Sequence, residues 1–214
     1  MSATRVTRLR CDYLVDPLGL DERSPRLSWQ LETPRRGARQ TAYRILVASS
    51  PERLARGEGD RWDSGRIAGD RTTHVVYQGA PLQSRDTCHW AVEVWDETGA
   101  SVRSAPAHWT MGLLAKTDWS AQWIAADPEI LRCDPQAITP TLTEPGTPAH
   151  FRREFEVAGP VRRATVYASA RGLFELHLNG RRVGEDLFAP EWTDYDKRIH
   201  YRTYDVTALV RTGP

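Results

Sequence analysis

The chain has 214 residues, of which 40% are hydrophobic and 27% are charged, as in an ordinary globular protein that can bury a core. Its 29 Lys and Arg residues nearly balance its 28 Asp and Glu residues and are scattered along the chain, which disfavours nucleic acid and membrane surfaces as partners. No window approaches the roughly 18 consecutive apolar residues of a membrane-spanning helix, so we expect the chain to stay in solution.

The N-terminus and the cysteines favour a cytoplasmic protein. The first ten residues hold three arginines, but no apolar run follows them, so no signal peptide is expected. The cysteines, Cys11, Cys88 and Cys133, are odd in number and lack the CxxC or Cys/His spacing of a metal site. Reduced thiols are the simplest interpretation, because disulfides are rare in the cytoplasm.

Short apolar runs separated by turn residues fill the first part of the chain, a spacing that is typical of a β-sandwich. Apolar and polar residues alternate over residues 89–95, which places Trp90, Val92 and Val94 on one face of a strand. We expect that face to lie in the core. Further strands are predicted at residues 44–48, 73–77 and 106–111, and an earlier one contains Trp29.

Helical patterns are scarce. The sequence predicts helical turns only at residues 51–57, which Ser50 can cap, and at residues 207–210. With so little helix and so many short strands, the first part of the chain resembles a fibronectin type III or immunoglobulin-like sandwich.

A proline-rich segment separates this part from the rest. Residues 127–148 contain five prolines and no regular hydrophobic pattern. Proline at this density prevents both a helix and a central strand, so an extended linker is expected. The sequence therefore predicts domains at residues 1–125 and 149–214, joined by a linker at 126–148.

A second set of strand patterns follows the linker. Apolar residues recur over 151–157 and again over 163–170, and residues 174–178 alternate between apolar and polar. The pair Asn179-Gly180 that follows is what a type I′ turn requires, so residues 181–183 can return as an antiparallel strand.

Residues 191–198 combine aromatic, acidic and basic side chains in a pattern that suits carbohydrate recognition. Aromatic rings can cover the apolar C–H face of a sugar, while Asp or Arg side chains bond its hydroxyl groups. An alternative is purely structural: the Trp fills the edge of a domain and the aspartates stabilise a turn by bonding backbone N–H groups. The candidate sugar-binding residues are Trp192, Asp194, Tyr195 and Asp196, with Arg171 as a more distant candidate.

No motif for other chemistry is present. The sequence lacks a GxSxG nucleophile elbow, a phosphate-binding glycine-rich loop, and HxH or HExxH spacing. Asp186, Asp194 and Asp196 are oxygen donors of the type that calcium prefers, but loop acids are more often solvated or capping residues. Glu175 and Glu191, with the aspartates at 194 and 196, are expected in turn and surface roles. We therefore predict no catalytic residue, no metal and no cofactor.

Several long motifs occur in one order along the chain. In the first part they include DPLGL (16–20), PRLSW (25–29), WDSG (62–65) and WAVEVWD (90–96). In the second part they include FELHLNGRRVG (174–184), PEWTDYDKR (190–198) and YRTYDVT (201–207). With these motifs the chain resembles the N-terminal portion of a bacterial α-L-rhamnosidase of glycoside hydrolase family 78.

The resemblance implies an inverting glycosidase that removes terminal α-L-rhamnose from glycosides. Inverting hydrolysis uses two carboxyl groups roughly 6.5 to 9.5 Å apart, and in this family they lie on an (α/α)₆ barrel further along the protein. We therefore expect a chain truncated before the catalytic barrel and inactive alone. The implied fold is all-β, a fibronectin III/immunoglobulin-like sandwich followed by an incomplete jelly-roll (galactose-binding-like) sandwich.

Two functions stay open from the sequence. In the first, the chain is the non-catalytic front of an α-L-rhamnosidase, which meets rhamnose-containing glycosides through the full-length enzyme and has its own catalytic domain as partner. In the second, it is a stand-alone carbohydrate-binding or scaffold module without hydrolase activity.

Overall fold

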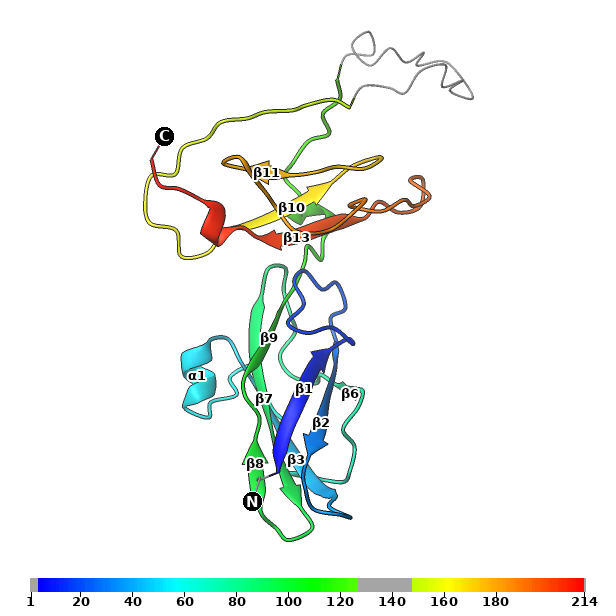
Figure 1. Cartoon of the computed structure of the whole chain (residues 1–214), viewed down its shortest axis with the longest axis vertical. Helices are drawn as coiled ribbons and strands as arrows, with labels where there is room; N and C mark the ends of the chain where they lie inside the picture. The colour runs from blue at the N-terminus through cyan, green and yellow to red at the C-terminus, as the bar shows by residue number, and fades with distance from the viewer. Residues whose placement is uncertain (1–3, 127–147, 214) are drawn as a thin grey trace.

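The computed structural model describes residues 4–126 and 148–213. Its strands form two bodies that stand one above the other along the longest axis of the molecule (Figure 1). The lower body, the N-terminal sandwich, contains strands β1 to β9, and the upper body, the C-terminal unit, contains β10 to β13. The predicted all-β class is confirmed. The linker predicted at 126–148 lies almost entirely outside the described residues and stays a prediction.

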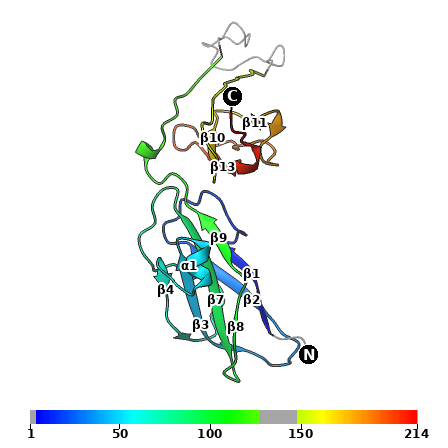
Figure 2. The ribbon, with the colours of Figure 1, turned by 90° about the vertical axis from the view of Figure 1, so that its left-hand side faces the viewer.

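Two antiparallel sheets form the N-terminal sandwich (Figure 2). The smaller sheet has the order β1-β2-β6 and consists of β1 (Arg5–Cys11), β2 (Arg26–Glu32) and β6 (Val75–Val76). The larger sheet has the order β4-β3-β7-β8, with β5 beside β3 and β9 beside β7. Its strands are β3 (Gln40–Ala48), β4 (Trp62–Asp63), β5 (Ile67–Ala68), β7 (Thr87–Asp96), β8 (Ser101–Arg103) and β9 (Ala107–Thr110). All four strands predicted by residue range in this part are present, with shifted ends.

The core of the sandwich lies between its two sheets. On β7, Trp90, Val92 and Val94 are at most 2% exposed, so the alternating pattern identified the core face correctly. Trp29 on β2 and Trp109 on β9 are equally buried in the same cluster. Burying a large apolar side chain stabilises the folded state by about 1.5–3 kcal/mol, which makes these residues the main support of the sandwich.

Helix α1 (Pro51–Ala55) lies against the outer face of the larger sheet (Figure 2). Its N-cap is Ser50, as predicted, and the Ser50 hydroxyl oxygen accepts a hydrogen bond from Arg53 N at 3.3 Å. Leu54 is 2% exposed and packs with Leu46 of β3. No helix within the described residues is long and apolar enough to cross a membrane.

The C-terminal unit contains two pairs of antiparallel strands. At the turn of one pair, Asn179 and Gly180 have φ values of 52° and 76°, which confirms the predicted hairpin with a turn of positive φ. The small core of the unit includes Val183, Tyr204 and Val206. Its strands are β10 (Thr165–Ser169), β11 (His177–Leu178), β12 (Arg181–Arg182) and β13 (Tyr201–Asp205), followed by the 3₁₀ turn η2 (Thr207–Leu209). A second 3₁₀ turn, η1 (Lys116–Asp118), follows β9 in the first part of the chain.

The strand expected at residues 151–157 does not form. Val157 makes an isolated bridge to Gly213, while Phe151 and Phe155 are 57% and 60% exposed. Cross-strand partners stabilise a strand, and among the residues that the structure describes no named strand pairs with this segment. The apolar spacing was therefore a misleading signal.

The two bodies meet at a contact centred on Tyr201 of β13. Its hydroxyl oxygen accepts a hydrogen bond from Leu113 N at 2.8 Å. A Cβ atom on Gly112 would lie 2.2 Å from this oxygen, and one on Gly19 would lie 2.2 Å from Thr203 Oγ1. The main chain of the N-terminal sandwich thus approaches β13 more closely than any residue with a Cβ atom would allow.

Aromatic and basic side chains extend this contact. The rings of Trp119 and Tyr201 have centroids 5.8 Å apart, and the Arg85 guanidinium lies 5.9 Å from the ring centroid of Tyr167 on β10. Arg163 of the C-terminal unit donates to the Thr87 hydroxyl on β7. These interactions join the two bodies through several elements of each.

Candidate functional site

The main candidate residues lie in the loop between β12 and β13. The rings of Trp192 and Tyr195 are stacked, with centroids 6.1 Å apart and planes inclined by 19°. Trp192 is 81% exposed, so it does not fill the edge of the domain as the structural alternative required. The exposed indole of Trp192, supported by the half-buried ring of Tyr195, offers a flat apolar surface that suits the C–H face of a sugar.

Backbone contacts anchor this loop. Gly172 N donates a hydrogen bond to the Tyr195 hydroxyl oxygen at 2.7 Å, and Phe174 N donates to the carbonyl oxygen of Ala189 at 2.8 Å. Ala189 and Pro190, which belong to this loop, are buried. The loop is therefore held against the segment that precedes β11, while the indole ring stays outside.

The two candidate aspartates differ in their contacts. Asp194 Oδ1 accepts a weak hydrogen bond from Asp196 N at 3.3 Å, and Asp194 Oδ2 lies 2.9 Å from Lys197 Nζ. The Asp194 carbonyl oxygen also accepts from Arg198 N at 2.8 Å. Asp194 therefore stabilises the turn, as the structural alternative expected. The Asp196 side chain is exposed and has no hydrogen-bond partner among the residues described.

Arg171 lies nearer to the stacked rings than its distance in sequence suggests. Its neighbour Gly172 is the residue that bonds the Tyr195 hydroxyl. The Arg171 guanidinium itself lies 5.9 Å from the ring centroid of Trp123, which is 59% exposed. Sequence reasoning did not identify Trp123 as a site residue, although it is a large apolar residue just before the proline-rich segment.

Sequence reasoning also missed a charged cluster that joins this loop to β13. Glu191 accepts a hydrogen bond from Arg202 of β13, and its Oε2 lies 3.8 Å from His200 Nδ1. Glu191 has a φ of 84°, which is uncommon for a non-glycine residue. The cluster fixes the backbone directly before Trp192. It could not be read from the sequence, since eleven positions separate the two members of the ion pair.

Glu175 is not arranged as a general acid. It lies 2.6 Å from His177 Nε2 and 3.4 Å from Arg182 Nε, and its side chain is more than half exposed. The hydrogen bond with His177, followed by the charge of Arg182, lowers the pKa of Glu175. An inverting glycosidase needs an acid whose pKa is raised, so this carboxylate serves as an ion-pair partner.

Potential metal ligands do not converge in residues 4–126 or 148–213, where no group of three His, Cys, Asp or Glu residues could hold an ion. The three loop acids that suggested calcium are Asp186, Asp194 and Asp196. The Asp186 side chain forms a hydrogen bond with Tyr204 instead. Burial, followed by the hydrogen bond with Asp186, raises the pKa of Tyr204 to about 12.

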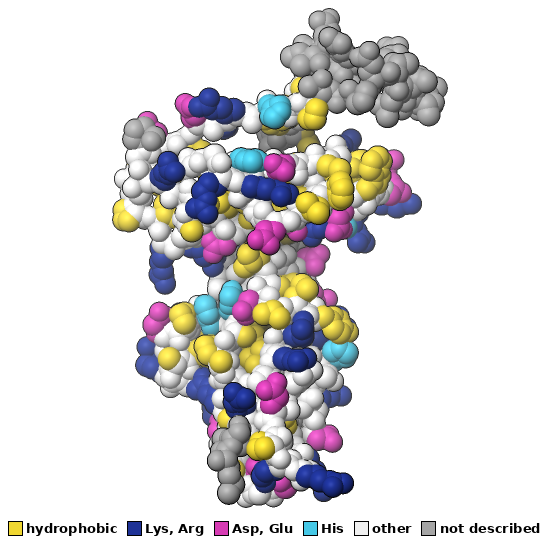
Figure 3. All heavy atoms as spheres, in the orientation of Figure 1, with side chains coloured by type: hydrophobic (Ala, Val, Ile, Leu, Met, Phe, Trp, Pro, Cys, Tyr) yellow, Lys and Arg dark blue, Asp and Glu magenta, His cyan; other side chains and the backbone are white. Residues whose placement is uncertain are grey.

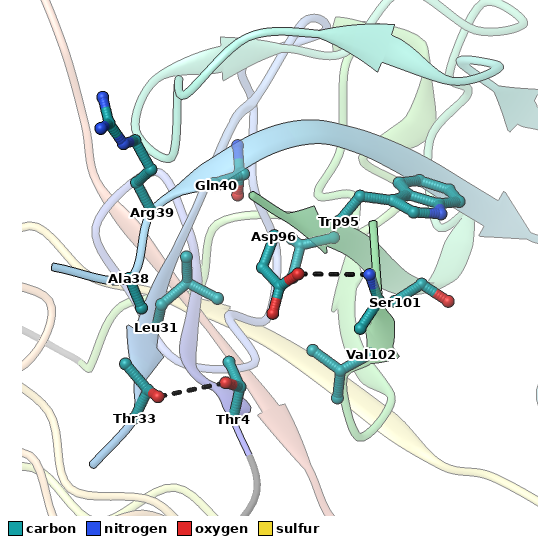
Figure 4. A pocket seen from close by; sticks show the side chains of 12 residues that line it. Thr4, Leu31, Thr33, Ala38, Arg39, Gln40, Trp95, Asp96, Ser101 and Val102 are labelled. Atoms are coloured by element: carbon teal, nitrogen blue, oxygen red, sulfur yellow. Dashed lines mark hydrogen bonds between the residues drawn. The ribbon is translucent and has the colours of Figure 1, made fainter. Parts of the chain in front are cut away.

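A pocket of about 240 Å³ opens between the two sheets at the end of the N-terminal sandwich that is remote from the C-terminal unit (Figure 4). Several of its polar side chains bond within the protein. Thr4 Oγ1 donates to Thr33 Oγ1 at 3.1 Å, and Gln40 accepts a hydrogen bond from Trp29 Nε1 at 3.0 Å. The Asp96 carboxylate binds Arg35. These groups maintain the fold, and the pocket is separate from the exposed aromatic loop.

Two family models match the chain. One, described as "Rha78A-like, N-terminal immunoglobulin domain", matches residues 6–115, and the other, "Alpha-L-rhamnosidase N-terminal domain", matches residues 159–214. An α-L-rhamnosidase from Alteromonas sp. (strain LOR) is 40% identical over 200 residues, and one from Streptomyces avermitilis is 29% identical over 370 residues. The chain spans only 21% and 36% of the lengths of these two relatives.

Solved structures of α-L-rhamnosidases have the same fold. The Streptomyces avermitilis enzyme complexed with L-rhamnose superposes with a TM-score of 0.85 and 26% identity, covering 99% of this chain and 36% of that one. The α-L-rhamnosidase from Dictyoglumus thermophilum superposes with a TM-score of 0.83 and 29% sequence identity. This match covers 98% of the present chain and 24% of that enzyme. The predicted immunoglobulin-like sandwich is confirmed by the first family model, which spans more than half of the chain. The chain therefore belongs to the α-L-rhamnosidase family, as an N-terminal part with a Rha78A-like immunoglobulin domain and an α-L-rhamnosidase N-terminal domain.

Proposed function

We propose that this chain acts as the non-catalytic N-terminal part of an α-L-rhamnosidase that hydrolyses terminal α-L-rhamnose from glycosides with inversion. The observation that carries the proposal is the 40% identity to the Alteromonas enzyme over 92% of this chain. The acid and base carboxylates belong to an (α/α)₆ barrel outside the chain. The interactions of Glu175 with His177 and Arg182, which lower its pKa, support the proposal that this carboxyl group is not a general acid.

We also propose the domain boundaries given by the sequence, at residues 1–125 and 149–214 with a linker between them. The ranges of the two family models, 6–115 and 159–214, fall inside these limits and support them. Limited proteolysis checks the boundary. Cleavage is expected first between residues 126 and 148, and a first cut inside β7 or β10 would contradict it.

A hybrid enzyme tests the function. This chain replaces the matched N-terminal region of the Alteromonas relative and is joined to the polypeptide that follows that region. The hybrid is expected to release L-rhamnose from an aryl α-L-rhamnoside, with the β anomer appearing first by proton NMR. The isolated chain is expected to match the buffer blank. Release by the isolated chain that Glu175→Gln or Asp194→Asn abolishes would overturn the proposal.

A second candidate function is direct contact with sugar. The 81% exposure of Trp192 and its stacking on Tyr195 favour it, with Asp194, Asp196 and Arg171 as hydrogen-bonding candidates. Titration of the isolated chain with L-rhamnose, followed by NMR, is expected to shift the Trp192 indole signal. Trp192→Ala is expected to remove the response. As a control, replacing Tyr13, an aromatic residue of the N-terminal sandwich that is 57% exposed, by Ala should change nothing.

We further propose a cytoplasmic location, without nucleic acid or membranes as partners. The free thiols of Cys11 and Cys88 support it, because reduced cysteines are typical of cytoplasmic proteins. Fractionation of the source cells tests this proposal, and recovery of the chain outside the cytoplasm would contradict it.

A further inference from the structure

Four large apolar side chains are exposed at one end of the C-terminal unit. Leu173 is 55% exposed, Leu187 72%, Phe188 73% and Trp192 81%, and we call this set the apolar tip. Hydrophobic side chains gather at the right-hand end of the C-terminal unit in Figure 3, where the orange loop of Figure 1 lies. A single exposed apolar residue is ordinary, but a cluster of this size marks an interaction surface.

The tip is held by hydrogen bonds beneath it. Leu173 lies between Gly172, which bonds the Tyr195 hydroxyl, and Phe174, which bonds Ala189 O. These bonds bring the segment around residue 173 against the loop that carries the other three side chains. Ala189 and Pro190 of that loop are buried and anchor it. A surface that is already ordered loses little conformational entropy when a partner covers it.

The chemistry of the tip favours a protein partner over a sugar. Leu173, Leu187 and Phe188 carry no polar atoms in their side chains, so they cannot bond the hydroxyl groups that cover most of a sugar. A groove lined with apolar side chains would bury them without leaving any polar group unpaired. Trp192 belongs both to the apolar tip and to the candidate sugar-binding residues, since its ring can stack on a sugar or fill an apolar groove.

Two observations identify the polypeptide that would supply such a groove. Strands β10 and β13 pair only with each other within the described parts of the chain, so each presents a free edge to further polypeptide. The related α-L-rhamnosidases are three to five times as long as the region matched here, since that region is 21% to 36% of their length. Both family models are of N-terminal domains, so the additional polypeptide of these relatives follows the matched region.

We propose that the apolar tip docks on the part of an α-L-rhamnosidase polypeptide that follows this N-terminal region. The proposal rests on the function proposed above and adds the surface through which the two parts meet. It assigns Leu187 and Phe188 to protein contact, and it separates them from the residues that the sugar hypothesis uses.

Hydroxyl-radical footprinting with mass spectrometry tests the docking, because it measures the solvent exposure of individual side chains. In the isolated chain, the oxidation rates of Leu187 and Phe188, each divided by the intrinsic reactivity of its residue type, are expected to match those of Tyr13 and Val15, which are 57% and 63% exposed on the N-terminal sandwich. In the hybrid enzyme, oxidation of the tip is expected to slow at least fivefold, while Tyr13 and Val15 keep their rates.

A matched pair of variants separates docking from folding. The double variant Leu187→Ser/Phe188→Ser is expected to leave the unfolding midpoint of the isolated chain unchanged, because both side chains are already in solvent. In the hybrid enzyme the same change is expected to restore fast oxidation of Trp192. A second hybrid, built with the Streptomyces avermitilis relative, repeats the measurement where the first does not fold.

Each outcome decides one of the proposals. An inactive hybrid with a protected tip supports docking and counts against the proposed function. An active hybrid with a fully exposed tip overturns docking and leaves the function intact. Docking is also overturned when L-rhamnose alone protects Leu187 and Phe188 in the isolated chain, or when protection appears at high concentration as two copies associate.

Discussion

Replacing Gly112 by Ala is expected to weaken the contact between the two bodies. The added Cβ atom would lie 2.2 Å from the Tyr201 hydroxyl oxygen and 2.8 Å from the carbonyl oxygen of Gly19. The tyrosine ring must therefore move, and its hydrogen bond with Leu113 N, now 2.8 Å long, is lost.

The size of the effect follows from these two changes. Overpacking a filled site costs about 1–3 kcal/mol, and loss of one hydrogen bond costs about 1 kcal/mol. Gly112→Ala is thus expected to lower the free energy of unfolding by about 2–4 kcal/mol. Tyr201→Phe removes only the hydrogen bond and is expected to cost about 1 kcal/mol. In the double variant the oxygen that clashes is absent, so the two costs should sum to less than their separate values.

Urea unfolding followed by circular dichroism and tryptophan fluorescence measures these differences. Gly159→Ala is the matched control, because no atom beyond its two chain neighbours lies within 4 Å of the position that its Cβ would take. Equal stability of Gly112→Ala and Gly159→Ala would refute the close approach. Additive costs in the double variant, within about 0.5 kcal/mol, would show that the Tyr201 hydroxyl is not the clashing group.

Three further predictions concern single residues of the fold. Burial, and then the charge of His108, lowers the pKa of His89, so the folded state binds fewer protons than the unfolded state and loses stability as the pH falls below about 6.5; His89→Gln should flatten urea midpoints between pH 7 and pH 5. Trp29→Phe leaves the Oε1 atom of Gln40 without its donor and is expected to cost about 1–3 kcal/mol in urea unfolding, whereas an unchanged midpoint would contradict the buried hydrogen bond. Gly180→Ala forces a φ of 76° on a residue with a Cβ atom, so a loss of about 1–2 kcal/mol is expected by thermal unfolding, again against Gly159→Ala.

Local patterns predicted the elements whose cause is local. The alternation over residues 89–95 identified the core face of β7 because successive side chains of a strand point to opposite faces. Ser50 and the Asn179-Gly180 pair were equally informative, since a cap and a tight turn each depend on a few neighbouring residues. The segment 151–157 misled because apolar spacing alone does not supply a partner strand.

The candidate site was predictable in composition but not in arrangement. The aromatic and acidic residues of 191–198 could be picked out, but the stacking of Trp192 on Tyr195 and its exposure depend on contacts with residues 172–174. The ion pair of Glu191 with Arg202 and the contact of Arg171 with Trp123 also join residues that are distant in sequence. Only the folded chain brings these side chains together.

The contact centred on Tyr201 predicts which residues vary together within the family. Gly19 and Gly112 present bare main chain to β13, and Gly19 also has a φ of 73°, so neither position accepts a side chain while Tyr201 and Thr203 stay in place. We expect homologues with this arrangement to keep both glycines, and any change there to be accompanied by a smaller residue at position 201 or 203. In homologues that have lost the C-terminal unit, no β13 approaches these two glycines. We therefore expect other residues to replace Gly19 and Gly112 freely in those proteins.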